Sequence, residues 1–562
     1  MIHKAKLYMY GFIKALQHVI AFHWKFILTF FIMNFLTIGW SLFSTDRPVE
    51  AVLYGFTLLL ALIFFTALIG FIPFRKLQDI IKIFVIAICS IPFLLETFTM
   101  YNYHALIGAG IINSILETNF KESIEFIQMY VGFKEFTIVF FVSAVMAYIV
   151  IKKPYRNIRV PERILSTIST LIIIICTISA VYMDIAYAEI LYGDPLPIQR
   201  VYASAKVAVD NMNAYKELVS KVNDDVRLTG NDSKIKNVVF ILGESTNRNH
   251  MHLYGYKLKN TPNLDRMESI GDIAVFRDVV SPHSTTIAVL SELFTFCHHE
   301  SDMPWYNYTN LIDVMNAAGY KTHWMSNQES SGIWGNVAQV YASHSTVHRF
   351  TRIRDSHEDN GVLDEELFPL IDDALASDDR DGKNFYVVHL MGGHGLYYNR
   401  FPYSFFKFNA DDIDMDLPEE KRTVMAEYDD ALYYNDYIVS SIIDKFRDSE
   451  TLVIYLPDHG EAVYDDGGFN GHIEENPSRH MIEVPMVIWA SDSFKDKYPD
   501  KWKRIMAAVN RPYMTDDMIH TVLDLTDIRT EDYDPTRSIV NDMFNSQRPR
   551  IFNGMNYDTE IR

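Results

Sequence analysis

The chain has 562 residues and a formal net charge of −20, and the charge is unevenly distributed. Residues 1–190 carry 15 basic and 11 acidic side chains, whereas the rest carries 36 basic and 60 acidic ones. This acidic second part excludes nucleic acid as an expected partner, because phosphate backbones are bound by basic patches. Of the three cysteines only Cys297 lies outside apolar runs, so no disulfide can form within this part.

Apolar runs in the first part predict five membrane-spanning helices, because about 20 apolar residues are needed to cross a bilayer core. The third span contains Pro92 and Glu96, which leaves its end undefined. Basic residues gather at the N-terminus and in the loops 75–82 and 152–163, which predicts that these face the cytoplasm. In a bacterium the chain would be a multi-pass inner-membrane protein with its C-terminal part in the periplasm. The predicted spans are 26–45, 51–74, 83–100, 136–151 and 164–187.

Three regions are predicted along the chain. Residues 1–190 form a five-helix transmembrane domain, residues 191–235 a bridging helical linker, and residues 236–562 a periplasmic α/β domain that holds the candidate site. Within the first region, the segment 101–135 mixes apolar and acidic residues at helical spacing. Its two interpretations are an amphipathic connector and a helix at the membrane surface that helps a lipid reach the site.

From residue 236 onward, short apolar runs alternate with helical patterns. This alternation predicts a mostly parallel central sheet covered by helices. The predicted strands are 237–242, 273–280, 321–326, 384–390, 451–456 and 484–490. The predicted helices include 286–297, 309–318 and 425–447.

Three of these strands end in groups that can bind a metal or act as acids and bases. Ligands of an open α/β sheet bind at the carboxyl ends of its strands, so these groups are expected to converge. Glu244, Asp458 and His459 then form an O, O, N set that suits zinc or manganese. Asp458 and His459 adjoin, and Gly460 is expected to permit the sharp turn they need. The strand ends carry Glu244, then His389 and His394, and then Asp458, His459 and Glu461. The structural alternative is that Asp458 caps a helix and His459 is a loop histidine.

A polar turn, residues 281–286, precedes an apolar helix and supplies a candidate nucleophile. A hydroxyl at a helix N-terminus meets free N–H groups and the helix dipole, both of which stabilise anions such as phosphate. A metal beside it can also make the hydroxyl nucleophilic. Thr285 and Thr286 are the candidates, and N-capping by Ser284 or Thr285 is expected in either case.

The chain resembles the membrane-bound phosphoethanolamine transferases of the alkaline phosphatase and sulfatase superfamily. The stretches "NPSRHM" and "DPTRS" are most similar to the branch that modifies the heptose core of lipopolysaccharide. The absence of paired cysteines sets the chain apart from the lipid A-modifying branch. The resemblance is carried by "GESTNRNHMHLYGY", "TPNLD", "STTIAVL", "GYKTHWMSNQ", "HLMGGHG", "YNDYI", "LPDHGEAVYDD", "NPSRHMIEVP" and "YDPTRSIVN".

The resemblance implies roles for individual residues. The zinc ligands would be Glu244, Thr286, Asp458 and His459, with Thr286 also the nucleophile and Ser245 and Thr246 supporting the turn. One zinc ion is expected to bind tightly, and a second is possible. His394 would contact the phosphoryl group or the second zinc, and Asn327 would help to bind the substrate. The other substrate histidine is either His472 or His480, of which His480 is favoured.

The resemblance also implies an activity, namely zinc-dependent transfer of phosphoethanolamine from phosphatidylethanolamine through a phosphothreonine-type intermediate. The acceptor would be lipopolysaccharide or lipooligosaccharide, at core heptose or lipid A, or another surface glycan. The alternative enzyme is a glycerol-phosphate transferase or phosphodiesterase on the same fold. A sulfatase is disfavoured because "SPHST" lacks the C/S-x-P-x-R pattern. A binding or scaffold protein is disfavoured by the complete ligand set, and a transporter by the few charges inside the spans.

Overall fold

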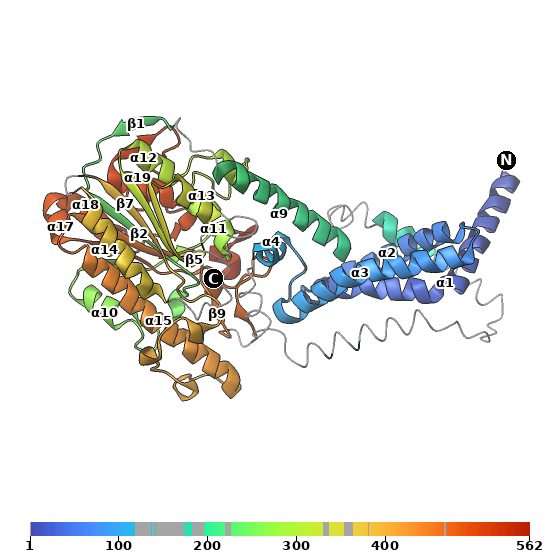
Figure 1. Cartoon of the computed structure of the whole chain (residues 1–562). Helices are drawn as coiled ribbons and strands as arrows, with labels where there is room; N and C mark the ends of the chain where they lie inside the picture. The colour runs from blue at the N-terminus through green and yellow to red at the C-terminus, as the bar shows by residue number, and fades with distance from the viewer. Residues whose placement is uncertain are drawn as a thin grey trace. The chain divides into compact units, whose positions relative to one another are not determined.

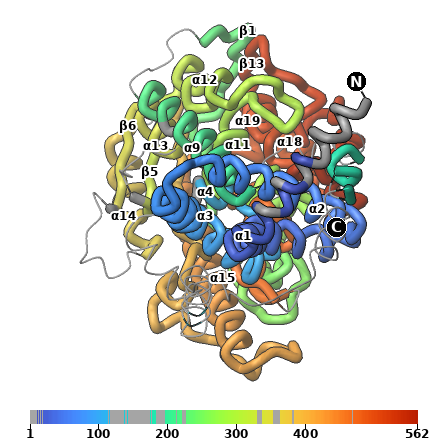
Figure 2. The backbone as a smooth tube through the Cα atoms, turned by 90° about the vertical axis from the view of Figure 1, so that its right-hand side faces the viewer, coloured from blue at the N-terminus to red at the C-terminus, as the bar shows by residue number. Residues whose placement is uncertain are grey.

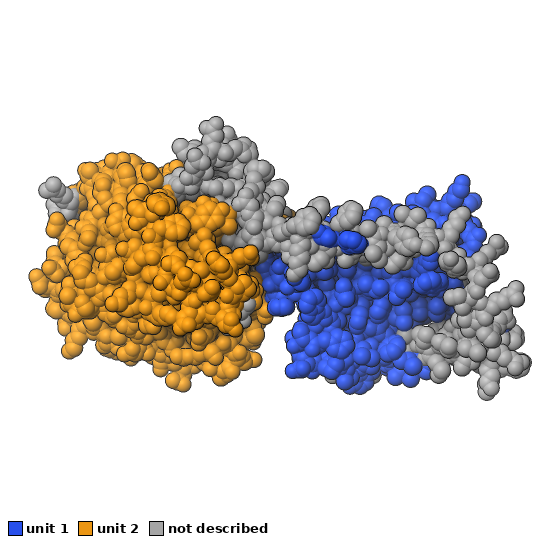
Figure 3. Space-filling model, turned by 90° about the horizontal axis from the view of Figure 1, so that it is seen from below, with its two compact units in different colours: residues 1–113, 127–208 blue, residues 114–126, 209–562 orange. Residues whose placement is uncertain are grey.

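The chain forms two compact units in its computed structural model, one of residues 1–113 and 127–208 and the other of residues 114–126 and 209–562. We call them unit 1 and unit 2 (Figure 3), and each is described separately. The described residues are 2–117, 137, 141, 174–175, 177–182, 196–219, 226–329, 337–352, 363–379, 382–465 and 468–562.

The described part of unit 1 contains three helices that are long and apolar enough to cross a membrane. They are α1 (Ile2–Ser44), of which Val19–Ser44 is the apolar part, α2 (Pro48–Gly70) and α3 (Arg75–Tyr103). Helix α1 packs against both α2 and α3 (Figure 1). The first three predicted spans are therefore confirmed as apolar helices, and α3 continues past Pro92 to Tyr103. The predicted spans 136–151 and 164–187 lie mostly outside the described residues.

Two further helices follow in the chain. Helix α4 (Ala109–Glu117) forms the start of the segment 101–135, whose remainder from residue 118 lies outside the described residues. Helix α9 (Pro197–Val219) lies within the predicted linker, which confirms the helical character of that part.

A buried ion pair lies among the helices of unit 1. The guanidinium of Arg200 donates from Nε to Glu96 Oε2 and from its terminal nitrogen to Glu96 Oε1, both at 2.6 Å. The Thr37 hydroxyl also donates to this carboxylate, and the Ile107 amide lies 3.4 Å from Oε2. Both charged side chains are buried, so each depends on the other for its compensation. The pair joins the start of α9 to α3 and α1.

We expect Glu96→Gln to destabilise the protein by about 3–5 kcal/mol, because it removes a buried carboxylate that compensates the buried Arg200 charge. The measurement is the thermal unfolding midpoint in detergent. Asp79→Asn is the control, because Asp79 pairs with Lys82 on the same helix but is exposed, and such a pair contributes only about 0–1 kcal/mol. The double variant Glu96→Gln/Arg200→Met should recover much of the loss. Equal midpoints for Glu96→Gln and wild type would contradict this account.

Unit 2 is built on a seven-stranded sheet with the order β3-β11-β8-β2-β7-β5-β6. The five neighbours from β8 to β6 pair in parallel, whereas β11 pairs antiparallel with both β3 and β8. The sheet is therefore mixed. The prediction of a mostly parallel sheet is confirmed in part, and β11 is the strand that runs in the opposite direction. The strands are β2 (Asn237–Gly243), β3 (Ile273–Phe276), β5 (Lys321–Glu329), β6 (Val347–Arg352), β7 (Asn384–His389), β8 (Thr451–Pro457) and β11 (Met486–Ala490).

Helices cover both faces of this sheet (Figure 1). Strand β2 shows why, because Val238, Phe240 and Leu242 pack on one face and Val239 and Ile241 on the other. A strand whose two faces are both covered is apolar throughout. The first face carries α11 (Thr286–Leu293), α12 (Leu311–Ala317), α13 (Val337–His344), α18 (Pro499–Ala508) and α19 (Met518–Thr526). The second face carries α10 (Pro262–Ser269), α14 (Leu367–Ser377) and α15 (Glu419–Lys445).

Two strand predictions need correction. The predicted strand 273–280 divides into β3 and a two-residue β4 (Val279–Val280), which pairs in parallel with β12 (Tyr513–Met514). The chain leaves the main sheet between them, where Arg277 N donates to Val509 O at 2.8 Å. The edge strand β6 has the sequence "VHRFTR" and was not predicted, because an edge strand can alternate polar and apolar residues without forming an apolar run.

Short elements complete unit 2. Strand β1 (Leu228–Asn231) pairs antiparallel with β13 (Ile528–Thr530), and the two lie side by side at the top of Figure 2. The two remaining hairpins pair β9 (Ala462–Val463) with β10 (Asn470–Gly471), and β14 (Ile551–Phe552) with β15 (Met555–Asn556). Two short helices, α16 (Arg479–Ile482) and α17 (Asp492–Lys497), also belong to the described part of unit 2.

Candidate active site

The carboxyl ends of β2 and β8 bring Glu244, Asp458 and His459 together. The two strands are parallel neighbours with Gly243 opposite Pro457, so the residues that follow them emerge side by side. All three side chains are buried, and one ligand atom from each lies within 4.8 Å of the others. His459 Nε2 lies 3.5 Å from Glu244 Oε1 and 3.5 Å from Asp458 Oδ2.

Thr286 joins this group from the start of α11. Its hydroxyl oxygen lies 3.3 and 3.4 Å from the two Glu244 carboxylate oxygens and 3.3 Å from His459 Nε2. The four residues expected to bind zinc therefore converge, although they come from three separate parts of the chain. Their roles as ligands and nucleophile stay predictions.

The expected side-chain cap of α11 is absent, which corrects the sequence interpretation. Thr285 occupies the N-cap position, but its side chain makes no capping hydrogen bond. The Ser284 hydroxyl lies 3.3 Å from Glu474 Oε2, and the Ser284 amide donates to the same oxygen at 2.9 Å. The turn is thus held by Glu474 rather than by a cap. The start of α11 beside Thr286 keeps its anion-binding character.

Ser245 and Thr246 support the turn, as predicted. The Ser245 amide donates to Asp458 Oδ1 at 3.2 Å, and its hydroxyl donates to Glu244 Oε1 at 2.8 Å. Ser245 has a φ of 50°, which is strained for a residue other than glycine and is typical of functional sites. The Thr246 amide donates to His459 O at 2.9 Å. This turn therefore orients both carboxylates.

The predicted reason for Gly460 is wrong. Gly460 does not adopt a left-handed φ, so it does not serve as a special turn residue. A Cβ atom at this position would lie 2.3 Å from His480 O, so glycine is required by the close approach of the backbone at residue 480. A left-handed glycine does occur nearby at Gly392, where a Cβ would lie 2.6 Å from Glu244 O.

The residues present fit a zinc ion. Burial and the neighbouring Asp458 carboxylate raise the pKa of Glu244 well above its ordinary value. Asp458 Oδ2 is buried and has no hydrogen-bond partner among the described residues. His459 Nδ1 lies 2.8 Å from Gly460 O and so carries a proton, which leaves Nε2 as the ligand atom. Burial also lowers the pKa of His459, which favours the neutral, ligating form. Two adjacent buried carboxylates and a neutral imidazole form a donor set that suits a zinc ion.

His394 and His472 lie next to this group. The His472 ring centroid lies 4.2 Å from that of His459 and 6.5 Å from that of His394. His472 Nδ1 contacts Glu461 Oε2 at 2.6 Å. Burial alone would lower the pKa of His472, but the Glu461 carboxylate outweighs it and raises the pKa. His459, Glu461 and His472 could hold a cation, and the second zinc stays a prediction.

His480 contacts Asn247 and Asp465. Its Nδ1 lies 3.2 Å from Asn247 Nδ2 and 3.5 Å from Asp465 Oδ1. The Asn247 amide group also donates to Glu461 O at 3.0 Å. The geometry therefore favours His472 over His480 as the second substrate histidine, the reverse of the preference drawn from the sequence.

The Asn327 side chain forms hydrogen bonds with Asp364 and Thr351. Its Nδ2 donates to Asp364 Oδ1 at 2.8 Å, and its Oδ1 accepts from the Thr351 hydroxyl at 2.6 Å. The next residue, Gln328, instead donates to Glu244 Oε2 at 3.2 Å. The two residues lie where the register of β5 against β6 shifts, between Ser326 and Glu329, and Gln328 is the one that contacts Glu244. The motif "SNQ" contained both amides, and only the register of β5 distinguishes them.

The last residue of the stretch "GESTNRNH", His250, lies in a second buried network of charged side chains. His250 Nδ1 contacts Asp429 Oδ1 at 2.9 Å, and Nε2 contacts Asp465 Oδ1 at 2.8 Å. Burial alone would lower the pKa of His250, but Asp465 and Asp429 outweigh it and raise the pKa to about 10. Asp465 follows β9, so the imidazolium holds the hairpin that carries Glu461 and His472. Sequence reasoning did not identify this network.

We expect His250→Gln to destabilise the protein by about 3–5 kcal/mol, because two buried carboxylates lose their counter-charge. The raised pKa means that this contribution is complete below the ordinary pKa of about 6.5 and is lost as the pH rises through about 10. The unfolding midpoints of variant and wild type should therefore differ at pH 6 and converge above the pKa of His250.

His252→Gln is the matched control for this prediction. His252 is partly exposed and pairs with Asp265, which is also partly exposed, so its loss should change stability by at most about 1 kcal/mol. A pH-independent difference between His250→Gln and wild type would contradict the charge-based account.

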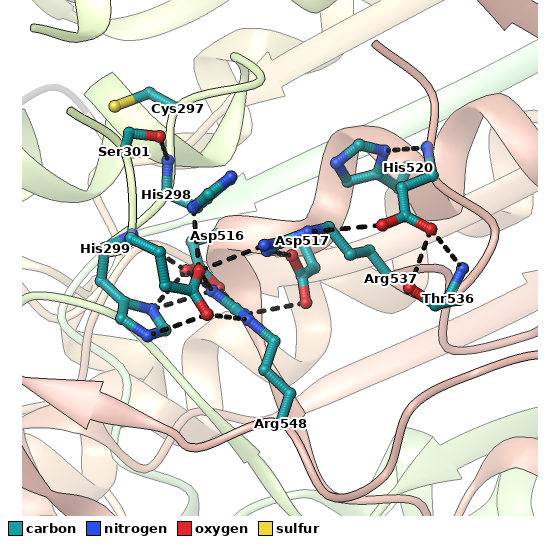
Figure 4. Close-up of polar contacts among 12 residues, drawn as sticks. Cys297, His298, His299, Ser301, Asp516, Asp517, His520, Thr536, Arg537 and Arg548 are labelled. Atoms are coloured by element: carbon teal, nitrogen blue, oxygen red, sulfur yellow. Dashed lines mark hydrogen bonds and ion pairs between the residues drawn. The ribbon is translucent and has the colours of Figure 1, made fainter. Parts of the chain in front are cut away.

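In a third group of acidic and histidine side chains, an arginine side chain supplies the positive charge. His299, Glu300 and Asp516 lie close enough to hold a metal, but the Arg548 guanidinium fills that position (Figure 4). Its nitrogens lie 2.6 Å from Asp516 Oδ2, 2.8 Å from Glu300 Oε2 and 2.8 Å from His299 Nδ1. Arg537 of the "DPTRS" motif donates to Asp517 Oδ1 at 2.7 Å. The motif is therefore part of an ion-pair network within unit 2.

Comparison with known proteins identifies the family. Residues 236–528 match the family model described as Sulfatase, which is more than half of the chain. The chain belongs to the sulfatase family. Residues 58–211 of this sulfatase-family chain match a second model, described as Phosphoethanolamine transferase EptA/EptB.

Individual relatives agree with both matches. The sulfatase-family chain is 32% identical over 323 residues to Phosphoethanolamine transferase EptC of Escherichia coli (strain K12), a match that covers 56% of this chain and 55% of the relative. It therefore spans about half the length of the curated relatives it matches. The crystal structure of the C-terminal periplasmic domain of EcEptC from Escherichia coli, in complex with Zn, matches with 30% identity and a TM-score of 0.55, covering 60% of this chain and 96% of that one.

A further solved structure matches the fold of the whole chain. It is the integral membrane protein lipooligosaccharide phosphoethanolamine transferase A (EptA) from Neisseria meningitidis, with a TM-score of 0.63 and 20% identity. The match covers 92% of this sulfatase-family chain and 97% of that one. At this identity the likeness establishes the fold alone.

Proposed function

We propose that the chain transfers phosphoethanolamine from phosphatidylethanolamine to lipopolysaccharide, lipooligosaccharide or another surface glycan. The observation that carries the proposal is the placement of the Thr286 hydroxyl 3.3 Å from both Glu244 and His459 at the start of a helix. The three apolar helices of unit 1 supply a membrane anchor, which a lipid donor requires. The site would face the periplasm from the inner membrane.

Zinc fits this site and would be held by Glu244, Thr286, Asp458 and His459. When bound, it would supply a Lewis acid that makes a hydroxyl nucleophilic near neutral pH. Glu244 and Asp458 are buried beside each other, and Ser245 fixes the orientation of both carboxylates. The residues are therefore preorganised for a cation of this kind.

The proposed first step forms a bond between Thr286 Oγ1 and phosphorus and breaks the bond from phosphorus to the diacylglycerol oxygen. Thr286 reacts as the alkoxide, its proton having passed to solvent, and the Glu244 carboxylate 3.3 Å away orients its oxygen. A histidine, His394 or His472, protonates the diacylglycerol oxygen as it leaves with the electron pair. The N–H groups at the start of α11 stabilise negative charge on the phosphoryl oxygens. Phosphoethanolamine is then attached to Thr286.

The second step reverses these roles. The histidine that gave its proton now accepts one from an acceptor hydroxyl, which attacks the phosphorus and displaces Thr286 Oγ1. The threonine oxygen leaves as the alkoxide, so the site returns to its starting state. The acceptor is most simply a sugar hydroxyl or phosphate, such as those of core heptose or lipid A.

The test is the intact mass of the purified, zinc-loaded protein after incubation with phosphatidylethanolamine, for wild type and for Thr286→Ala. One added phosphoethanolamine on the Thr286 peptide of the wild type, absent from the variant, would support donor, nucleophile and covalent route together. An adduct formed only from phosphatidylglycerol would instead support a glycerol-phosphate transferase. An adduct on both proteins would overturn Thr286 as the nucleophile.

A further inference from the structure

The exposed aromatic side chains of unit 2 gather in one short segment. Within the described part of this unit, the large aromatic side chains that are exposed are Tyr398, Tyr403 and Phe406, at 44%, 89% and 50% of full exposure. All three lie in residues 396–408, directly after the glycine that follows His394, and we call this stretch the aromatic segment. Exposed apolar residues elsewhere in the described part of unit 2 are aliphatic and scattered, such as Ile270 and Met543.

The aromatic segment is firmly held from its inner side. The buried Tyr397 donates from its hydroxyl to Glu461 Oε1 at 2.7 Å, which ties the segment to the candidate active site. The Phe408 amide donates to Asp430 Oδ1 at 3.0 Å. The Phe405 ring lies against Tyr434 of α15, with the centroids 4.8 Å apart. These contacts hold the segment against α15, so a loose backbone does not explain the exposure of the outer rings (α15 is labelled in Figure 1).

The chemistry of this surface matches the interface of a membrane. Tyrosine and other amphipathic aromatic side chains prefer the headgroup region, where an apolar ring and a polar tip are both satisfied. The described part of the same chain carries three helices long and apolar enough to cross a membrane, and in the proposed function they anchor the chain in a bilayer. The exposed Asp411 and Asp416 follow the segment, whereas Asp414 is paired with Lys257 at 3.1 Å. The charge of Asp411 and Asp416 disfavours an anionic surface. The surface thus suits a zwitterionic phospholipid bilayer.

We propose that the aromatic segment docks into the headgroup region of a zwitterionic phospholipid bilayer and holds His394 near the lipid donor. The proposal deepens the proposed function and rests on it for the identity of the donor. Docking would shorten the path of a headgroup from the bilayer to Thr286 without adding any group to the chemistry.

The test compares two donors on the full chain in phosphatidylcholine vesicles. Tyr403→Ser/Phe406→Ser should lower turnover of long-chain phosphatidylethanolamine in the vesicle by roughly tenfold, equivalent to about 1.4 kcal/mol. Turnover of water-soluble dihexanoyl-phosphatidylethanolamine should stay at the wild-type rate, because that donor reaches the site without docking. Ile270→Ser/Met543→Ser removes equally exposed apolar residues, at 66% and 63%, and should change neither rate. Tyr403→Ser alone guards against a folding defect, because that side chain is almost fully exposed.

Loss of turnover with both donors, or with neither, would overturn docking. A second measurement does not depend on activity. Tryptophan introduced by Tyr403→Trp should be quenched by lipids with brominated acyl chains, beyond the signal of the wild type, whereas that of Ile270→Trp should not. Equal quenching of the two variants would overturn docking even if the proposed function holds. Inactivity of the wild type with both donors would overturn the proposed function, while the quenching result would still decide docking.

Discussion

Thr286→Ala should lower turnover by at least roughly three orders of magnitude, because removal of a nucleophile leaves only the other features of the site. The variant should fold normally. Thr286 is half-buried at the first position of α11, and its hydroxyl contacts only site residues among those described. Alanine is also a favourable residue in a helix. The measurement is the initial rate of phosphoethanolamine transfer, together with the thermal unfolding midpoint.

Thr285→Ala is the matched control. Thr285 is the neighbouring threonine and was an alternative nucleophile on the sequence, but its side chain makes no capping hydrogen bond. Its loss should therefore leave both turnover and the unfolding midpoint close to those of the wild type. Normal turnover in Thr286→Ala with loss in Thr285→Ala would exchange the two assignments. Thr286→Ser keeps the hydroxyl and should retain measurable activity.

Glu244→Gln should abolish zinc binding and, in zinc-free buffer, make the protein more stable than the wild type. Glutamine has the shape of glutamate but no charge, so it removes the repulsion between two buried carboxylates. The gain should be about 1–3 kcal/mol, the usual penalty of a poorly compensated buried polar group. Substitution of a residue that supports a metal ligand lowers metal affinity by up to roughly 100-fold. Loss of the ligand itself should lower the zinc affinity by more than that. Bound zinc is measured by elemental mass spectrometry, and stability by unfolding with zinc and with chelator.

Glu483→Gln distinguishes loss of zinc from loss of any buried carboxylate. Glu483 is also buried, but it is already compensated, with Arg248 at 3.4 Å and Asn249 at 2.7 Å. Its replacement should lower stability and leave zinc bound, which is the opposite pattern. Zinc should raise the unfolding midpoint of the wild type, because a ligand that binds the folded state stabilises it. Stoichiometric zinc in Glu244→Gln would contradict the ligand assignment.

The sequence was sufficient for features that depend on local pattern. Apolar runs, of which the first two contain no charge, predicted α1 to α3, because the length and composition of a run decide whether it can cross a membrane. Apolar strands followed by acids and histidines predicted that Glu244, Asp458 and His459 would meet, because parallel neighbours deliver their carboxyl ends to one edge. A polar turn before an apolar helix left Thr285 and Thr286 as candidates, and the family resemblance favoured Thr286.

Other features depended on contacts between distant segments. The direction of β11 could not be predicted, because a fully buried strand has the same apolar pattern when it is reversed. The register of β5 is irregular between Ser326 and Glu329, so the sequence could not choose Gln328 over Asn327. His472 and His480 both follow the metal pair, and the hairpin β9–β10 brings only His472 against the His459 ring. Such choices follow from packing and register, and neither is encoded in the residues next to the side chain concerned.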